Sequence, residues 1–377
     1  MNKAICAYPW RAVAVRPNGQ LIPCCRYAND YQKHEEAMVY SKDPRNSSHW
    51  VELRDNMLSG KKTEYCDKCY KEEDSGIKSM RQHSLEMFTP TENKIVPLQQ
   101  LEVSFNNLCN LACVHCGSYF SSTWYSEDYK KGKIGKIGVL QHDVSFDNWD
   151  LSQLRELKII GGEPFMEQKK FISLMNKLDL SNMFLQICTN GTYLPNEELK
   201  FQIERCNGVY LEVSLDGIYE VNDWYRWPSK FNNIIENMKT YEEWFNHNPK
   251  IRKIVHYVIN AVNVMYLPDF INYMQQNFPN WDITWDWIQG PDWQQICVLP
   301  DSVKIELIKK FTVLNHSYPK NQYRIPNPYK VTIDRLTDTP KISWKEFKNK
   351  TLELSEDRKL NFLEMVEKFK PIWNLDK

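Results

Sequence analysis

One short run of the sequence, from Cys109 to Cys116, constrains this chain more than any other feature. It follows the apolar stretch 101–105 and places Cys109, Cys113 and Cys116 at C-x3-C-x2-C spacing. A cubane iron-sulfur cluster needs thiolates from several directions, and these gaps let one loop bind three of its irons while the fourth stays open. Zinc prefers a closed set of four ligands, and no second C-x2-C pair follows within about seventy residues. The spacing therefore predicts an iron-sulfur site; the alternative is three structural cysteines.

The composition is that of a folded protein with a large core. The 377 residues are 42% hydrophobic and include 13 Trp, 20 Tyr and 16 Phe, enough for two or three structural units. Lys plus Arg (48) balances Asp plus Glu (48), so net charge offers no argument for nucleic acid or an anionic membrane as partner. The first residues contain no signal-peptide-like apolar core, and no apolar run reaches the roughly 18 residues of a membrane span. We expect a cytoplasmic protein whose eleven cysteines are ligands or buried thiols and form no disulfides.

Between residues 96 and 300, apolar runs of strand length alternate with stretches of helical period, the pattern of repeated βα units around a parallel sheet. The six predicted strands are 101–105, 157–160, 183–188, 209–215, 254–259 and 283–288. Their Ile, Val, Leu and aromatic content is typical of fully buried parallel strands. We therefore expect an α/β fold, a partial (βα)6 TIM-type barrel over 96–300. A small cysteine-rich domain at 1–95 would precede it, and a helical extension at 301–377 would follow. In that extension, Leu360, Leu363, Val366 and Phe369 form a narrow stripe on one predicted helix, which Pro371 ends.

Polar segments follow the ends of the predicted strands, where ligands bind in βα sheets. The second strand ends in Gly161-Gly162-Glu163-Pro164, where glycines allow close approach of the backbone and the carboxylate can accept a hydrogen bond from an ammonium group. Asn190 lies at the end of the third strand, and Ser214 and Asp216 lie at the end of the fourth. Each segment alone would be an ordinary turn. Their place downstream of the cysteine run makes a shared site the better interpretation.

The last predicted strand alternates Asp or Thr with Trp, so Asp282, Thr284 and Asp286 share one face and the tryptophans share the other. Two arrangements are open. Either the Asp face lines the barrel and the tryptophans pack against helices, or the reverse.

A second set of cysteines precedes the predicted barrel. A tight turn at Asn18-Gly19 predicts a hairpin that brings Cys6 and Cys24 to one side, and a C-x2-C pair, Cys66 and Cys69, follows a predicted helix at 49–59. Four cysteines can complete one metal site, and by spacing alone zinc and iron-sulfur fit equally well.

The cysteine run resembles the signature of the radical S-adenosylmethionine (radical SAM) superfamily, C-x3-C-x-(aromatic)-C, with His115 at the aromatic position. Gly161-Gly162-Glu163-Pro164 resembles the GGEP motif of the same family, which has the partial-barrel fold expected above. The resemblance implies a [4Fe-4S] cluster on Cys109, Cys113 and Cys116 whose open iron chelates S-adenosylmethionine. It also implies cofactor contacts, with His115 beside the adenine, Gly161, Gly162, Glu163 and Pro164 at the methionyl amino group, and Asn190, Ser214 and Asp216 near the ribose or carboxylate.

The segment Cys6-x12-Gly19-x4-Cys24 is similar to the start of SPASM and twitch domains, which hold auxiliary [4Fe-4S] clusters in many radical SAM enzymes. This likeness implies an auxiliary cluster on Cys6, Cys24, Cys66 and Cys69, with Cys25 an alternative to Cys24. In most such enzymes the auxiliary domain follows the barrel, whereas here it precedes it.

The resemblance implies an enzyme that reductively cleaves S-adenosylmethionine to a 5'-deoxyadenosyl radical and abstracts hydrogen from a substrate, with a flavodoxin or ferredoxin as reducing partner. We expect the substrate to be a peptide or protein side chain. The nearest alternative is a small-molecule dehydrogenase or rearrangement enzyme acting on a carbohydrate, aminocyclitol or nucleotide. An alternative of another class is a non-catalytic iron-sulfur or zinc carrier or scaffold.

Overall fold

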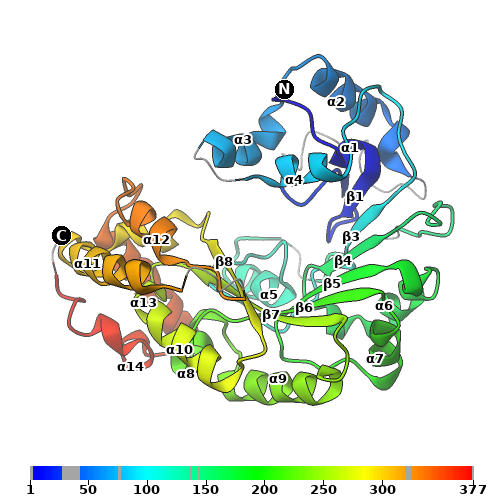
Figure 1. The fold of residues 1–377 in the computed structure, drawn as a ribbon. Coiled ribbons are helices and arrows are strands. Elements are labelled where there is room, and N and C mark those ends of the chain that lie inside the picture. The colour runs from blue at the N-terminus through cyan, green and yellow to red at the C-terminus, as the bar shows by residue number, and fades with distance from the viewer. Residues whose placement is uncertain are drawn as a thin grey trace. The chain divides into compact units, whose positions relative to one another are not determined.

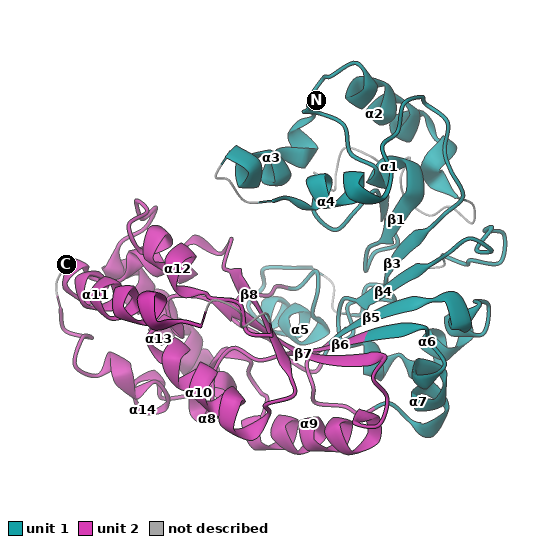
Figure 2. Cartoon of the chain, in the orientation of Figure 1, with its two compact units in different colours: residues 1–109, 118–188, 195–209 teal, residues 110–117, 189–194, 210–377 magenta. Residues whose placement is uncertain are grey.

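The computed structural model describes residues 3–27, 43–74, 78–135, 138–142, 144–319 and 324–375. The chain divides into two compact units, which Figure 2 shows in different colours. Unit 1 contains residues 1–109, 118–188 and 195–209, and unit 2 contains residues 110–117, 189–194 and 210–377. None of the helices in the described ranges has both the length and the hydropathy needed to cross a bilayer.

The strands form one eight-stranded sheet in the order β2-β1-β3-β4-β5-β6-β7-β8. Their bounds are β1 Ala12–Val15, β2 Leu21–Ile22, β3 Gln100–Ser104, β4 Glu156–Ile160, β5 Phe184–Thr189, β6 Gly208–Ser214, β7 Ile251–Ile259 and β8 Asp282–Trp287. From β3 to β8 the order in the sheet follows the chain, as in a βα barrel, and β2 and β8 remain edges, so the sheet is open. This confirms the predicted α/β class and partial barrel.

Helices connect these strands and form most of the C-terminal region (Figure 1). In unit 1 they are α1 Tyr8–Arg11, η2 Pro44–Asn46, α2 Ser48–Leu58, η3 Glu64–Cys66, α3 Asp67–Asp74, α4 Met80–Met87, α5 Ser122–Lys130, η4 Pro164–Met166, α6 Gln168–Met175, η5 Leu180–Asn182 and α7 Glu197–Glu204. In unit 2 they are α8 Tyr219–Tyr225, α9 Phe231–Phe245, η6 Val264–Tyr266, α10 Leu267–Asn277, η7 Asp292–Gln294, η8 Ile296–Val298, α11 Asp301–Ser317, α12 Tyr329–Leu336, α13 Trp344–Asp357, α14 Phe362–Met365 and η9 Glu367–Phe369.

All six strands predicted for the barrel are present, and the largest difference in their bounds is that β7 begins at Ile251. Their burial differs from the expectation of continuous burial. In β4, β5 and β6, buried side chains alternate with half-buried ones. One face of each strand is therefore packed in the core, while the other carries half-buried polar residues such as Lys158 and Glu212.

The predicted N-terminal hairpin is also present, with Ala14 opposite Ile22, and Gly19 adopts φ +85° in its turn. The structure adds a pairing that the sequence did not predict, because β1 runs parallel to β3. The hairpin thus extends the sheet. Helices α1 to α4 gather beside it (Figure 1), over a core that includes Trp10 and Tyr27.

The C-terminal region is helical as expected, but the single helix predicted across residues 360–369 is wrong. Helix α14 ends at Met365, its C-cap Val366 has φ −123°, and the short η9 follows. Residues seven apart in a continuous helix lie about 10 Å apart along its axis. The break instead brings the Phe362 and Phe369 rings to 5.1 Å between centroids, within an aromatic cluster that includes Trp344 and Trp373.

Candidate functional site

The cysteine loop begins in unit 1, directly after β3, and the first turn of α5 holds its backbone. The amide of Cys109 donates to Ser122 Oγ at 3.1 Å. The carbonyl of Cys109 accepts from the hydroxyls of Ser122 (3.1 Å) and Thr123 (2.7 Å). The first predicted cluster ligand therefore has a fixed backbone position, while its thiol takes no part in these bonds.

The Gly-Gly-Glu-Pro segment after β4 packs directly against this loop. Gly161 and Gly162 have φ of +77° and +49°. A Cβ on Gly161 would lie 2.3 Å from Ser104 Oγ, and one on Gly162 would lie 2.3 Å from the carbonyl oxygen of Leu108. The amide of Glu163 donates to that same carbonyl at 2.7 Å. The two motifs that the sequence pairs are thus in contact one residue before Cys109, at a place where only glycine fits.

Replacing Gly162 by alanine is expected to lower the free energy of unfolding by about 1–3 kcal/mol, because the new Cβ would collide with the Leu108 backbone at a positive φ. Gly135 is the matched control, since a Cβ there meets nothing within 4 Å. Urea unfolding of both variants measures the difference. An unchanged stability for Gly162→Ala would contradict the close packing of the two motifs.

Glu163 is 1% exposed, and its Oε1 accepts from the amide of Phe165 at 3.0 Å. Its side chain therefore caps η4, which buried Pro164 begins. The carboxylate lies at the end of β4, where the family resemblance expects it. Its contact with a methionyl amino group stays a prediction.

The rest of the cysteine loop, residues 110–117, lies in unit 2, where backbone bonds and one arginine hold it. The amide of Ala112 donates to the carbonyl of Trp227 at 2.7 Å, and that of Val114 to the carbonyl of Tyr225 at 2.9 Å. Arg358 Nη2 donates to the carbonyl of Ala112 at 2.8 Å. This loop has no helix or strand of its own, so its shape depends on these partners.

His115 stacks on Tyr225, with ring centroids 5.5 Å apart and 24° between the ring planes. Its Nδ1 is buried without a hydrogen-bond partner among the described residues and lies 3.7 Å from Asp216 Oδ2. Burial lowers the pKa of His115 to about 4; Asp216 opposes this shift, while Arg226 and His256 add to it. The imidazole is therefore neutral near pH 7.

Asp216 is fully buried, and both its carboxylate oxygens are bonded within unit 2. Oδ2 accepts from Arg226 Nη1 at 2.7 Å, and Oδ1 accepts from the amide of Val258 at 3.1 Å. This carboxylate joins the end of β6 to α8 and β7. The structure thus gives Asp216 a positioning role beside His115, and its predicted direct contact with a cofactor stays a prediction.

The other two predicted cofactor contacts lie at the ends of β5 and β6. Asn190 Nδ2 donates to Asn110 Oδ1 at 2.9 Å, which ties it to the cysteine loop, and its Oδ1 accepts from the amide of Thr192 at 2.9 Å. Ser214 is half-buried as the last residue of β6. Ligand contacts of either residue remain untested predictions.

The orientation of β8, left open by the sequence, is decided by its neighbours. Trp285 packs against Tyr257 of β7 and Phe270 of α10, with centroids 5.7 and 6.3 Å away. The polar face therefore points the other way, where Thr284 Oγ1 lies 2.9 Å from His256 Nδ1. The arrangement with tryptophans packed against a helix is confirmed.

Sequence reasoning missed several residues around the loop, namely Tyr225, Arg226, His256 and Arg358. His256 had a usable signal, because it is a polar residue within the apolar run 254–259 and so marks that strand's other face. Arg226 and Arg358 had none. They reach the site from helical segments distant in sequence.

All eleven cysteines are free thiols. Burial raises the pKa of Cys113 and raises that of Cys116 to about 12, so both thiols are protonated without a metal. Among the described residues, no three His, Cys, Asp or Glu side chains are gathered in metal-binding geometry. In donor type, spacing and burial, the cysteine loop nevertheless fits an iron-sulfur cluster, which would bind thiolates after proton loss.

The N-terminal cysteines lie together within unit 1. Cys6, Cys24 and Cys66 pack on the same hydrophobic core. After burial and Cys25, the neighbours that raise the pKa of Cys24 are Cys6 and Cys66, and those that raise the pKa of Cys66 are Cys6 and Cys69. Together with Cys69, which raises the pKa of Cys66, these thiols fit one metal site in donor type and number.

Cys25 has different surroundings. Its pKa is raised to about 11 by burial and by Glu102, and is lowered by Lys158 and two arginines. Its Sγ lies 3.9 Å from the sulfur of Met80. Cys24 therefore lies with Cys6 and Cys66, whereas Cys25 lies by Glu102 and Met80.

Cys24→Ala is expected to lower bound iron by the content of one cluster, whereas Cys25→Ala keeps the wild-type content. The reason is that Cys24, unlike Cys25, packs on the same core as Cys6 and Cys66. Iron and sulfide analysis of the two reconstituted variants makes the comparison, each serving as control for the other. Loss of iron in Cys25→Ala alone would reverse this ligand assignment.

The fold and site define an α/β protein with an open sheet and a three-cysteine loop at the carboxyl end of β3. Among solved structures, the chain is similar to anSMEcpe with bound AdoMet, at 14% identity and a TM-score of 0.41, over 59% of this chain and 58% of that one. It is also similar to SuiB from Streptococcus suis bound to S-adenosylmethionine, at 13% identity and a TM-score of 0.34, over 70% of this chain and 51% of that one. Both alignments span less than two thirds of the solved chains. No family model and no curated protein sequence matches the chain.

Proposed function

We propose that this chain is a radical SAM enzyme that reductively cleaves S-adenosylmethionine and abstracts hydrogen from a peptide or protein side chain. The observation that supports this most is the contact between the two motifs. Leu108, next to Cys109, accepts the amide of Glu163 and excludes any side chain at Gly162. Three structural cysteines would have no need of a glycine-rich strand end packed against their loop.

In this proposal Cys109, Cys113 and Cys116 would hold a [4Fe-4S] cluster with one open iron. When bound, the cluster would supply the electron that cleaves the sulfonium of S-adenosylmethionine. The chain's own residues fix the surroundings. Arg358 and the 225–227 backbone hold the loop, Tyr225 stacks on neutral His115, and Asp216, paired with Arg226, lies 3.7 Å from that ring.

Cys6, Cys24, Cys66 and Cys69 would hold an auxiliary [4Fe-4S] cluster, for which zinc is the alternative. A flavodoxin or ferredoxin would reduce the enzyme. We also propose a cytoplasmic location, because eleven thiols and reduced clusters need a reducing compartment.

A polar substrate suits the half-exposed face of β7 and β8, which carries His256 and Thr284. Strand β7 also bonds Asp216 through the amide of Val258, and Asp216 Oδ2 lies 3.7 Å from His115 Nδ1 of the cysteine loop. A peptide backbone or a polar small molecule could use these groups, and a carbohydrate, aminocyclitol or nucleotide substrate remains the alternative.

The test is formation of 5'-deoxyadenosine by anaerobically reconstituted, dithionite-reduced protein given S-adenosylmethionine alone. Slow uncoupled cleavage needs no known substrate, so product is expected. An iron-replete protein that forms none would favour a carrier or scaffold. Mass analysis of added substrates then separates a modified peptide from an oxidised small molecule.

A further inference from the structure

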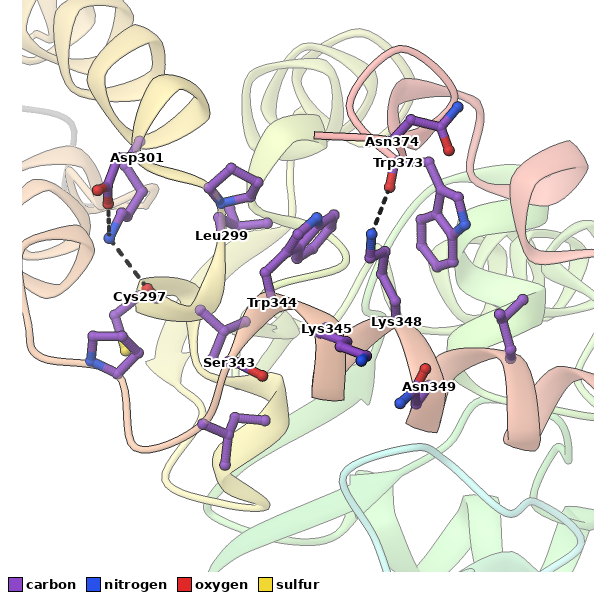
Figure 3. A pocket seen from close by; sticks show the side chains of 16 residues that line it. Cys297, Leu299, Asp301, Ser343, Trp344, Lys345, Lys348, Asn349, Trp373 and Asn374 are labelled. Carbon is purple, nitrogen blue, oxygen red and sulfur yellow. Dashed lines mark hydrogen bonds and ion pairs between the residues drawn. The ribbon is translucent and has the colours of Figure 1, made fainter. Parts of the chain in front are cut away.

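The two ends of helix α13 have different surroundings within unit 2. The first turns border a groove of about 900 Å³, which is lined in part by Trp344, Lys345 and Lys348 (Figure 3). The other end is the C-cap residue Arg358, whose side chain extends to the cysteine loop. The C-terminal helical region therefore contacts the proposed cluster site through this end of α13.

Two contacts fix the guanidinium of Arg358 against the loop. Its Nη2 donates to the carbonyl of Ala112 at 2.8 Å, and the group lies over the Trp227 ring, 5.0 Å from the ring centroid. Arg358 is 6% exposed. Because a guanidinium stays protonated in proteins, a buried positive charge is bonded to the residue directly before Cys113.

The ionisation of Cys113 responds to this charge. Cys113 is 6% exposed. Burial raises the pKa of its thiol most; Arg226 lowers that pKa, Asp216 raises it and Arg358 lowers it. Asp216 is the ion-pair partner of Arg226, so the effects of these two residues oppose each other. Arg358 acts in addition to that pair and favours negative charge on the Cys113 sulfur.

The same charge affects a cluster on this loop when it is reduced. Accepting one electron adds one negative charge, and the net charge around a cluster is one of the factors that set its reduction potential. At an effective dielectric constant of about 20, two charges interact about fourfold more strongly than in water. A buried cation beside the loop thus stabilises the reduced cluster more than the oxidised one. This sign is independent of the other contacts of Arg358, because any neutral replacement removes the same positive charge.

We propose that Arg358 is a positioning residue that raises the reduction potential of the cluster on Cys109, Cys113 and Cys116 by holding a positive charge against the loop. The C-terminal helical region would then take part in electron uptake as well as in packing. A flavodoxin, a ferredoxin or dithionite supplies the one electron, and no bond of Arg358 forms or breaks. The presence of the cluster rests on the proposed function.

The experiment is a redox titration of the anaerobically reconstituted full-length chain, followed by the electron paramagnetic resonance of the reduced cluster. The signal that changes when S-adenosylmethionine is added belongs to the cluster with the open iron. Arg358→Gln removes the charge but keeps an N–H donor for the Ala112 carbonyl. It is expected to weaken the affinity of this cluster for an electron about tenfold, which lowers the potential by about 59 mV for a one-electron couple. Arg358→Met is a second neutral variant and should shift the potential in the same direction.

Two variants that do not remove a buried charge serve as controls. Arg358→Lys keeps the positive charge and should keep the electron affinity within about threefold of wild type. Lys359→Gln makes the same change of charge on the next residue, which is exposed, so solvent and salt screen it and the affinity should stay within about twofold. Iron content and thermal unfolding midpoints show that each variant is loaded and folded.

A wild-type potential in Arg358→Gln would overturn the inference, and so would equal shifts in Arg358→Gln and Arg358→Lys, because the effect would then come from loop geometry and not from charge. A chain that forms 5'-deoxyadenosine while Arg358→Gln keeps its potential retains the proposed function and loses this inference. A chain whose cluster shows the expected shift but which forms no 5'-deoxyadenosine does the reverse.

Discussion

Cys113→Ala is expected to reduce 5'-deoxyadenosine formation by more than about a hundredfold, to the level of cluster-free protein. The two thiols that remain, Cys109 and Cys116, cannot hold a cluster that needs three local ligands. The backbone of the loop should persist, because Ala112 and Val114 form its hydrogen bonds to residues 225–227. The measurement is 5'-deoxyadenosine per protein, with iron content determined on the same sample.

Cys206→Ala is the matched control. Cys206 is 1% exposed, and its thiol donates to the carbonyl of Gln202 at 3.6 Å within the same helical segment. We expect this variant to keep wild-type iron content and turnover and to lose only the small packing energy of a buried thiol. Wild-type turnover in Cys113→Ala, or equal loss in both variants, would contradict the assignment of the loop as the cluster site.

Asp216→Asn is expected to lower the free energy of unfolding by about 3–5 kcal/mol, a large part of the stability of an ordinary domain. Asp216 is fully buried and is the carboxylate partner of Arg226, which is 6% exposed. The substitution leaves that guanidinium buried beside a neutral amide. Urea unfolding followed by far-ultraviolet circular dichroism measures the loss.

The second variant for this pair is Asp216→Asn with Arg226→Met, which removes both charges. Part of the lost stability should return, because no uncompensated charge remains buried. Asp286→Asn is the surface control, since Asp286 is exposed and lies 3.9 Å from His256, and its effect should stay within about 1 kcal/mol. If Asp216→Asn proved as mild as that control, the ion pair would not be what supports His115.

The strands from β3 to β8 could be predicted, because each is an apolar run of strand length bounded by turn residues. The parallel pairing of β1 with β3 could not. The turn residues Asn18-Gly19 predict the antiparallel pairing of β1 with β2. They do not indicate which strand pairs with the other edge of β1.

The two cysteine sites likewise have features that the sequence predicts and features that it does not. The spacing of Cys109, Cys113 and Cys116 and the glycines at 161 and 162 are local patterns, and the structure places the two motifs in contact at Leu108. Spacing cannot decide whether Cys24 or Cys25 is the metal ligand. The two residues are adjacent, so their spacings to every other cysteine differ by only one position. Only the packing of the N-terminal core distinguishes them, by directing Cys24 toward Cys6 and Cys66 and Cys25 toward Glu102 and Met80.

The sequence by itself determined the α/β class, the succession of strands and the cysteine and glycine motifs, since all of these follow from residue types and short spacings. Only the tertiary structure decided what supports the loop, through Arg358 on Ala112, Arg226 on Asp216 and Tyr225 on His115. Arg358 and Ala112 are separated by 246 residues. Contacts between residues so far apart in sequence depend on how helices and strands pack together. Periodicity and spacing along the chain do not predict them.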